Sequence, residues 1–333
     1  MILSPRSLRS AAVNVASMLL NGQLADLSPM PADRLGEGSG RAVLRYRFPE
    51  WLVPAGPPVL LVPSPGVPAR CYDLRRGGSL VEHVVDAGRL TYLLEGPAGP
   101  ADPRAGAAQW AGEILPSVIR RVSSDAGGQP VQLVGWSLGG TLALLTAAAD
   151  PSLPIASVAA IAPATGAGLP GTVDQIIAAG HGLLRAYHVL ARIDDRDHLA
   201  QREALDRFAA ALRAHPGRGL TESYAAYLGA ALAGEEELSI GGREVSLARI
   251  GVPVLAIAGD GDRIAPPRAV RDLTLSMVSS PRVRFEIASG DHLGVLTGGQ
   301  ARTTTWTYLD RWLDEGILRH GLRPHHQEEA AAM

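Results

Sequence analysis

The sequence predicts an α/β fold with a mostly parallel central sheet, helices on both faces and a helical cap insertion. Short apolar runs recur along the 333-residue chain, and most of them are too uniformly apolar to leave one face in water. Helix-like stretches separate many of these runs, as in a parallel sheet whose crossovers are helices. One long interval, residues 166–248, has a helical pattern without a good strand candidate. Such an insertion is typical of a lid or cap over strand ends.

The strand candidates are of two kinds. Residues 42–48, AVLRYRF, alternate between apolar and polar and predict a half-exposed antiparallel strand. The others are compact and apolar, which predicts strands covered on both faces. They span residues 58–66, 90–96, 131–137, 157–164, 253–260 and 283–290.

Helix candidates lie between these strands and fill the cap. In the sheet region they span residues 77–88, 110–124 and 138–150, and in the cap 172–193, 198–215 and 221–234. We therefore expect four parts. They are an N-terminal helical extension (1–40), the α/β core (41–165 and 249–320), the cap insertion (166–248) and a disordered tail (321–333).

The N-terminal segment predicts a short amphipathic helix. Leu8, Ala12, Val15 and Leu19 recur at helical spacing. Polar residues interrupt this stretch, which falls short of the roughly 20 apolar residues of a spanning helix. We expect no transmembrane segment. Packing on the body is one role for the helix, and contact with a membrane, a granule or a second subunit of a homodimer is the other.

Composition excludes several classes of function. The 31 basic and 33 acidic residues give a net charge of −2, without the basic excess typical of nucleic-acid binding. Cys71 is the only cysteine, so no intramolecular disulfide can form, and a reducing cytoplasm is the expected location. We expect no metal and no bound cofactor, and we expect Cys71 to be a core or loop residue rather than a reactive thiol.

A candidate nucleophile lies in residues 135–139, GWSLG, which fit the pattern G-x-S-x-G. In that pattern the serine occupies a strained turn between a strand and a helix. The flanking glycines avoid collisions with the neighbouring strand and helix, and the following helix directs its first amides at a developing oxyanion. A strand candidate precedes Ser137 and a helix candidate follows it, so the context matches.

A serine nucleophile needs a base and a group that orients the base, and this fold supplies them in the order Ser, acid, His. Asp260 and Asp262 both follow the strand candidate 253–260, and Asp262 is preferred because it opens the loop beyond the strand. His292 follows the last strand candidate and is the predicted base. Asp291 adjoins His292 and is expected to tune it or to be solvated.

Other polar and aromatic candidates have weaker claims. His181, His188 and His198 lie in the cap and are expected on helix surfaces. Trp136, beside the serine, lines an acyl pocket or fills the core, and the sequence leaves both readings open. The predicted oxyanion donors are the backbone N–H of Leu138 and one from the loop after residues 58–62. Ser64, Gly66 and Val67 remain as donors there because proline has no N–H, and Gly66 is preferred.

These residues are those of an α/β-hydrolase, and further segments resemble one branch, the polyhydroxyalkanoate synthases. Residues 57–100, 238–267 and 289–295 are similar to that family in order, within a resemblance that covers roughly residues 55–300. The resemblance implies a nucleophile that captures a hydroxyacyl group from coenzyme A, with Asp262 and His292 carried over. Coenzyme A would then be a substrate moiety and not a cofactor.

The chain departs from that family at its nucleophile, which is serine here and cysteine there. A serine acyl-enzyme is an oxygen ester, less activated than a thioester, and it needs His292 as a base during attack. Two further departures are Glu95-Gly96, where the synthases usually have an aromatic residue, and Asp291, where a glycine commonly precedes the histidine. The sequence therefore predicts a serine acyl hydrolase of esterase, thioesterase or depolymerase type. Acyl transfer, as in a polyester synthase, and a non-catalytic binding or granule-associated relative are the alternatives.

Overall fold

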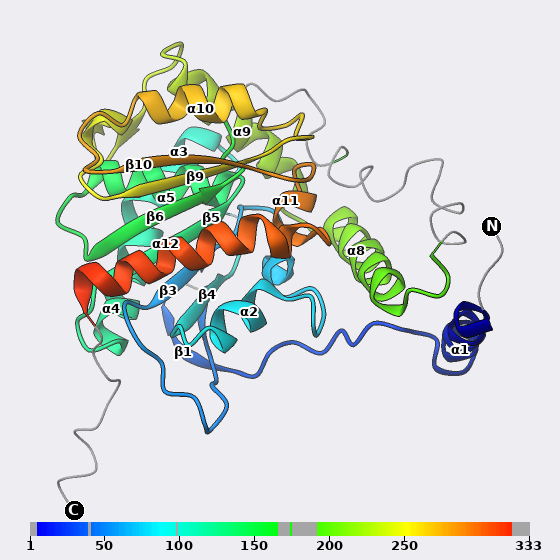
Figure 1. Ribbon diagram of the computed structural model, residues 1–333. Coiled ribbons are helices and arrows are strands. Elements are labelled where there is room, and N and C mark those ends of the chain that lie inside the picture. Colours follow the sequence, from blue (N-terminus) through cyan, green and yellow to red (C-terminus); the bar gives the residue numbers. More distant parts are fainter. Residues whose placement is uncertain (1–4, 39–40, 98, 166–173, 175–191, 322–333) are drawn as a thin grey trace, which may run out of the picture.

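The computed structural model describes residues 5–38, 41–97, 99–165, 174 and 192–321. At its centre is an eight-stranded sheet in the order β1-β2-β4-β3-β5-β6-β9-β10 (Figure 1). The β1–β2 and β2–β4 pairs are antiparallel, and the other neighbours are parallel. The strands are β1 (Ala32–Gly38), β2 (Arg41–Tyr46), β3 (Val59–Val62), β4 (Thr91–Glu95), β5 (Val131–Trp136), β6 (Ile155–Ile161), β9 (Val254–Gly259) and β10 (Val283–Ala288).

Helices cover both faces of the sheet, which confirms the predicted α/β class. In β3, Val59 and Leu61 belong to one apolar cluster, whereas Leu60 and Val62 belong to the other. The first cluster is closed by α2 (Leu80–Asp86) and α12 (Thr305–His320), and the second by α4 (Leu115–Asp125) and α5 (Leu138–Ala149). Burial on both faces explains why these strands are uniformly apolar.

Two strands differ from the sequence prediction. Residues 32–38, which the sequence placed in the helical extension, form β1 and pair with β2 at one edge of the sheet. Their sequence, ADRLGEG, lacks the β-branched and aromatic residues typical of strands, so pairing with β2 decides the conformation. At the other edge β10 is only partly buried, because it has a strand neighbour on one side.

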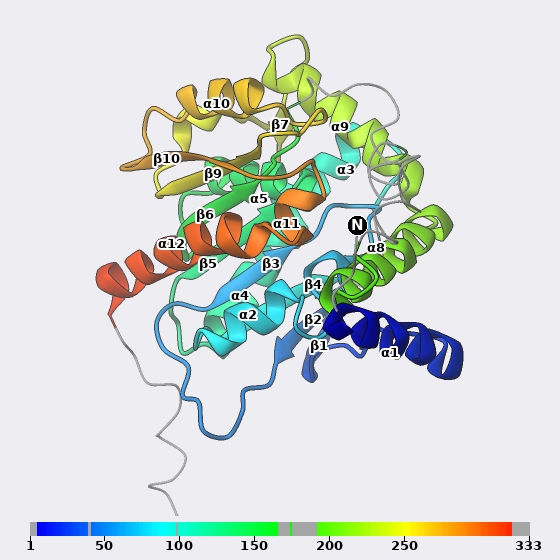
Figure 2. The same ribbon diagram turned by 45° about the vertical axis from the view of Figure 1, so that its right-hand side comes forward.

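The described part of the cap consists mainly of α8 (Arg196–Ala214) and α9 (Arg218–Leu232) (Figure 2). Residues 239–244, within the interval predicted to be helical, form a small hairpin of β7 (Ser239–Ile240) and β8 (Arg243–Glu244). The helix expected over residues 172–193 lies almost wholly outside the described residues, as do His181 and His188.

Polar contacts tie the cap to the core. Arg75 donates to the side chains of Asp197 at 2.6 Å and Gln201 at 2.7 Å, both on α8. Gln201 donates in turn to the carbonyl of Thr297 at 2.6 Å. From α9, the Thr221 hydroxyl donates to the carbonyl of Pro65 at 2.9 Å. The cap helices are thereby held against the loops at the carboxyl ends of the strands, where parallel α/β sheets carry their sites.

The N-terminal helix α1 (Pro5–Asn21) lies beside α8 (Figures 1 and 2). The Asn14 side chain donates to the carbonyl of Ile193, and Glu203 on α8 accepts from the backbone N–H groups of Leu24 and Ala25. Leu8, which the sequence placed on the apolar face, is more than half exposed. Within the described ranges, no helix is both long and apolar enough to cross a bilayer. The predicted tail lies outside those ranges from residue 322 on.

Candidate active site

Ser137 occupies the turn between β5 and α5. Its backbone angles are φ 55° and ψ −129°, a conformation that residues other than glycine rarely adopt. The Ser137 N–H donates to the carbonyl of Ile161 on β6, and the carbonyl of Ser137 accepts from Gly140. Both bonds hold the strained turn, which matches the geometry that the sequence predicted for this residue.

Gly135 and Gly139 are needed because the backbone around Ser137 is crowded. A Cβ atom on Gly135 would lie 2.5 Å from the Gly139 carbonyl carbon, and one on Gly139 would lie 2.1 Å from the carbonyl oxygen of Val62. Both distances are far below van der Waals contact. The two glycines let α5 start directly against β5 and β3, which leaves the turn sharp.

We expect Gly139→Ala to lower the free energy of unfolding by about 3 kcal/mol, since the new methyl group meets backbone that cannot move aside. Urea denaturation followed by circular dichroism measures this change. Gly219→Ala is the matched control, because a Cβ atom at that position in α9 meets nothing within 4 Å. The control should be neutral or slightly stabilising, and equal losses in both variants would contradict the steric argument.

The structure brings together all three residues that the sequence selected. His292 Nε2 lies 2.9 Å from Ser137 Oγ, and His292 Nδ1 lies 2.8 Å from Asp262 Oδ2. The carboxylate accepts, so Nδ1 carries the proton and Nε2 is left to accept from the serine hydroxyl. All three residues are buried. The arrangement can withdraw a proton from Ser137.

The structure also separates the three acidic candidates. Asp262 Oδ1 accepts from the backbone N–H groups of Ile264 and Ala265, at 2.8 and 2.9 Å, which leaves Oδ2 directed at His292. Asp260 instead accepts from the N–H of Gly290 at 2.9 Å. Asp291 accepts from the N–H of Gly294, the first residue of the short helix α11 (Gly294–Thr297). Of the three, Asp262 is the one hydrogen-bonded to His292, whereas Asp291 accepts at the start of α11.

The N–H of Val67 is not available as an oxyanion donor, because it donates to the carbonyl of Ser64 at 3.1 Å. The side chain of Ser64 helps to hold the serine turn, a role that the sequence did not suggest. Its buried hydroxyl donates to the carbonyl of Trp136 at 2.9 Å and accepts from the N–H of Gly139 at 3.4 Å. These bonds join the loop after β3 to the serine turn, so the two segments that would supply oxyanion donors, at Leu138 and Gly66, are held together.

Two buried aromatic residues complete the support of this turn. Trp136 has no exposed area, which favours a core role for this residue over the pocket role that the sequence left open. Its Nε1 donates to the carbonyl of His292 at 2.8 Å, and the two ring centroids are 5.2 Å apart. The Tyr72 hydroxyl accepts from the N–H of Trp136 and donates to the carbonyl of Val62. It bridges β3 and β5 where they diverge, a role that sequence spacing does not reveal.

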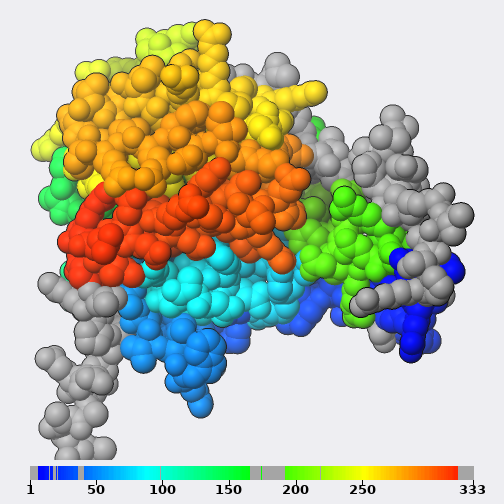
Figure 3. Space-filling view, viewed as in Figure 1, coloured from blue at the N-terminus to red at the C-terminus, as the bar shows by residue number. Residues whose placement is uncertain are grey.

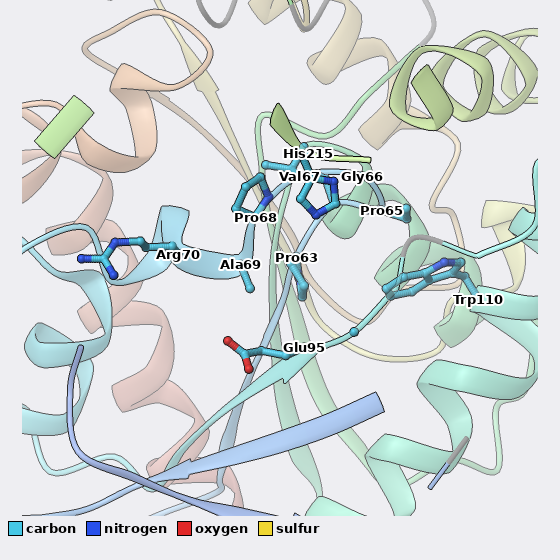
Figure 4. Close-up of a pocket in the computed structure, with 12 residues that line it drawn as sticks. Pro63, Pro65, Gly66, Val67, Pro68, Ala69, Arg70, Glu95, Trp110 and His215 are labelled. Atoms are coloured by element: carbon cyan, nitrogen blue, oxygen red, sulfur yellow. The ribbon is translucent and has the colours of Figure 1, made fainter. Parts of the chain in front are cut away.

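A cavity of about 340 Å³ adjoins the loop after β3 (Figure 4). Its polar lining includes Glu95 at the end of β4 and His215 before α9. His215 Nδ1 accepts from the N–H of Gly217 at 3.1 Å, so Nε2 carries the ring proton. Burial lowers the pKa of His215, which keeps the ring neutral near pH 7. Residues 63–70, Gly96 and Trp110 form the remaining walls.

Cys71 is buried next to Tyr72, and burial raises the pKa of its thiol. We expect no reaction of the folded chain with a thiol reagent such as dithionitrobenzoate at pH 8, and one equivalent of reaction in 6 M guanidinium chloride. Rapid labelling of the folded protein would contradict the core assignment.

Among the described residues, no group of three or more His, Cys, Asp and Glu side chains could hold a metal ion. His198 lies in the first turn of α8, where its backbone N–H donates to Asp195. The candidate catalytic arrangement among the described residues is therefore the chain of hydrogen bonds from Ser137 through His292 to Asp262. A serine, a histidine and a carboxylate in this order and spacing can perform acyl transfer.

No family model and no curated protein matches this sequence. Solved structures do match its fold. A soluble variant of monoglyceride lipase from Saccharomyces cerevisiae is 15% identical, with a TM-score of 0.58 over 87% of this chain and 96% of that one. The enol-lactonase from Burkholderia xenovorans LB400 is 16% identical, with a TM-score of 0.54 over 86% of this chain and all of that one. An alpha/beta hydrolase fold protein from Nakamurella multipartita is 17% identical, with a TM-score of 0.53 over the same shares. This chain therefore has the α/β-hydrolase fold.

Proposed function

We propose that this protein is a serine acyl hydrolase that acts on an ester or thioester. The observation that carries the proposal is the hydrogen-bonded chain from Ser137 through His292 to Asp262, built on a strained turn. Backbone strain of this kind clusters at functional sites. The lipase and lactonase activities named for two proteins of the same fold are consistent with this chemistry.

In the first step, Ser137 Oγ attacks the substrate carbonyl carbon while its proton passes to His292 Nε2. The imidazolium that forms is stabilised by Asp262, whose other oxygen is fixed by two backbone N–H groups. The carbonyl oxygen becomes an oxyanion, which the N–H groups of Leu138 and Gly66 receive. Leu138 is the first residue of α5, so the helix dipole adds to the same stabilisation.

Collapse of the intermediate breaks the bond to the alcohol or thiol, which leaves with the proton from His292. Water then attacks the Ser137 ester and gives its proton to His292 Nε2, and the second collapse returns that proton to Ser137 Oγ. The products are a free acid and the unchanged enzyme. No step needs a metal or an organic cofactor, and coenzyme A enters as the leaving thiol of a thioester substrate.

We place part of the substrate in the cavity beside the loop that carries Gly66. His215 offers a neutral N–H donor there, and Glu95 offers an acceptor. This pairing suits a substrate with a hydroxyl or carbonyl group near the scissile bond, as in the hydroxyacyl groups that the sequence resemblance implies. Medium-length acyl groups are the accompanying expectation.

For this cavity we expect His215→Leu to raise KM for the preferred substrate about fivefold with little change in kcat. One neutral hydrogen bond is worth about 1 kcal/mol, which corresponds to that factor. His215→Gln keeps a donor and should lose less. Steady-state kinetics at pH 7.5 measures both variants, and an unchanged KM in His215→Leu would remove this histidine from the substrate site.

A panel of nitrophenyl esters and acyl-CoA thioesters, with acyl chains of 2 to about 16 carbons, tests the proposed reaction. We expect free acid as the main product and a maximum at one range of chain length. If no member of the panel turns over, the chain is the non-catalytic binding relative instead.

Acyl transfer is the second candidate, and the sequence resemblance to polyhydroxyalkanoate synthases favours it. A Ser137 ester can pass its acyl group to an alcohol as well as to water. Incubation with 3-hydroxyacyl-CoA distinguishes the two outcomes by mass spectrometry. Free hydroxy acid supports hydrolysis, whereas hydroxyacyl oligomers as the main product would overturn it.

A further inference from the structure

The strand β10 leaves one edge of the sheet open. It pairs with β9 on one side, and no other strand in the described part of the chain pairs with its second side. Val283 is 37% exposed and Ile287 is 50% exposed on this strand. Natural proteins normally protect such an edge with charges, prolines or a covering segment, because it offers unpaired N–H and C=O groups to another strand.

The outward-facing backbone groups of β10 belong to its odd-numbered residues. The N–H of Val254 donates to the carbonyl of Arg282, and the N–H of Asp260 donates to the carbonyl of Ala288. Backbone groups alternate in direction along a strand, so the even-numbered residues face β9. The N–H and C=O groups of Val283, Phe285 and Ile287 therefore point away from the sheet. One of them, the carbonyl of Ile287, accepts from the Tyr308 hydroxyl of α12 at 3.4 Å, and pairing with a second strand would replace this long hydrogen bond.

When the β10 strands of two copies are paired antiparallel with Phe285 at the centre, their side chains are complementary. In that register Phe285 lies opposite its own copy, Arg284 lies opposite Glu286, and Val283 lies opposite Ile287. Because Phe285 has outward backbone groups, the central pair is a hydrogen-bonded one. A register centred on Arg284 or Glu286 would place like charges opposite each other and would also turn the backbone groups the wrong way.

A partly apolar surface lies alongside this edge. Phe285 and Ile287 line a groove of about 480 Å³ with α10 (Pro267–Leu275), which contributes Pro267 and Leu275 and three charged residues, Arg268, Arg271 and Asp272. Arg284 lies on the opposite face, 3.3 Å from Glu315 of α12. Leu275 and Val278, at the end of α10 and beyond it, are both more than two-thirds exposed. This region is part of the orange surface in Figure 3. Apolar side chains gathered beside an open edge fit an interface rather than a permanent contact with water.

We propose that β10 is the interface of a homodimer, in which the β10 strands of two copies pair antiparallel across a two-fold axis at Phe285. The sheet then runs continuously through both subunits, and the interface is isologous. The partner's copy of the groove is adjacent, so both apolar surfaces are covered together. Dimerisation through β10 does not depend on the proposed reaction.

Sedimentation velocity of the full chain between 1 and 100 μM tests the interface. We expect a dimer for the unmodified protein. Two substitutions disrupt the proposed charge pairs, Arg284→Glu and Glu286→Arg. Each places like charges opposite one another at both symmetry-related 284–286 pairs, and each should raise the dissociation constant of the dimer at least about tenfold. Arg34→Glu is the matched control, since Arg34 is exposed on β1 at the other edge of the sheet. It should leave the dimer intact.

Mixing the two single variants gives the sharper result. An Arg284→Glu subunit opposite a Glu286→Arg subunit restores both charge pairs, so the mixture should form a heterodimer that neither variant forms with itself. Circular dichroism of each variant verifies the fold. A monomeric unmodified protein, or a dimer that both variants retain, would overturn the proposal.

Discussion

Ser137→Ala should lower kcat for the preferred ester by about 10⁶-fold, the scale on which loss of a serine nucleophile acts when its base and its orienting acid remain. The reason is chemical and not structural. Alanine keeps the backbone and removes only the hydroxyl that His292 Nε2 contacts at 2.9 Å. The backbone N–H groups proposed to receive the oxyanion stay in place, so some residual rate above the uncatalysed reaction is expected.

Steady-state rates with the best ester of the panel measure this loss. Ser279→Ala, at an exposed position in the turn before β10, is the matched control and should keep full activity. The thermal midpoint should be nearly unchanged in both variants. Activity of Ser137→Ala within tenfold of the unmodified protein would show that another residue performs the attack.

Asp262→Asn should lower kcat by about 10⁴-fold. The amide keeps the size of the carboxylate but loses its charge. The amide can also present its NH₂ group to His292 Nδ1, which would move the ring proton to Nε2. A protonated Nε2 cannot accept a hydrogen bond or a proton from Ser137. Hydrogen bonds from the backbone N–H groups of Ile264 and Ala265 to the remaining oxygen keep the side chain in position. The substitution should therefore lower kcat without disturbing the fold.

Asp260→Asn is the control that the chain itself supplies. Asp260 is two residues away on the same loop, where it accepts from the N–H of Gly290 and the hydroxyl of Ser289 rather than from His292. We expect its kcat to stay within about tenfold of the unmodified protein, since the lost interaction is a loop contact. If the two substitutions had equal effects, the assignment of the acid would be wrong.

Most of the core could be predicted from the sequence because its parallel strands are buried on both faces. Burial demands compact apolar runs, and these runs marked β3 through β6 and β9. The strand β1 could not be predicted in this way. It is an edge strand with two glycines and three charged residues, and its conformation depends on pairing with β2, which a local pattern does not contain.

The three residues of the hydrogen-bonded chain could be selected from the sequence because each follows a strand, in a fixed order. The residues that support them could not. Ser64, Tyr72 and Trp136 act through bonds to backbone atoms far away in the sequence, and backbone atoms carry no sequence signal. The indole of Trp136 illustrates this limit, because its neighbour in sequence is Ser137 but its hydrogen bond goes to His292.

Covalent labelling shows whether Ser137 is a nucleophile that His292 activates. A fluorophosphonate probe reacts with activated serines, and peptide mass spectrometry locates the adduct. We predict one adduct per chain at Ser137, lost in Ser137→Ala and strongly slowed in His292→Ala. An unlabelled folded protein, or an adduct on any other residue, would mean that Ser137 is not the activated nucleophile.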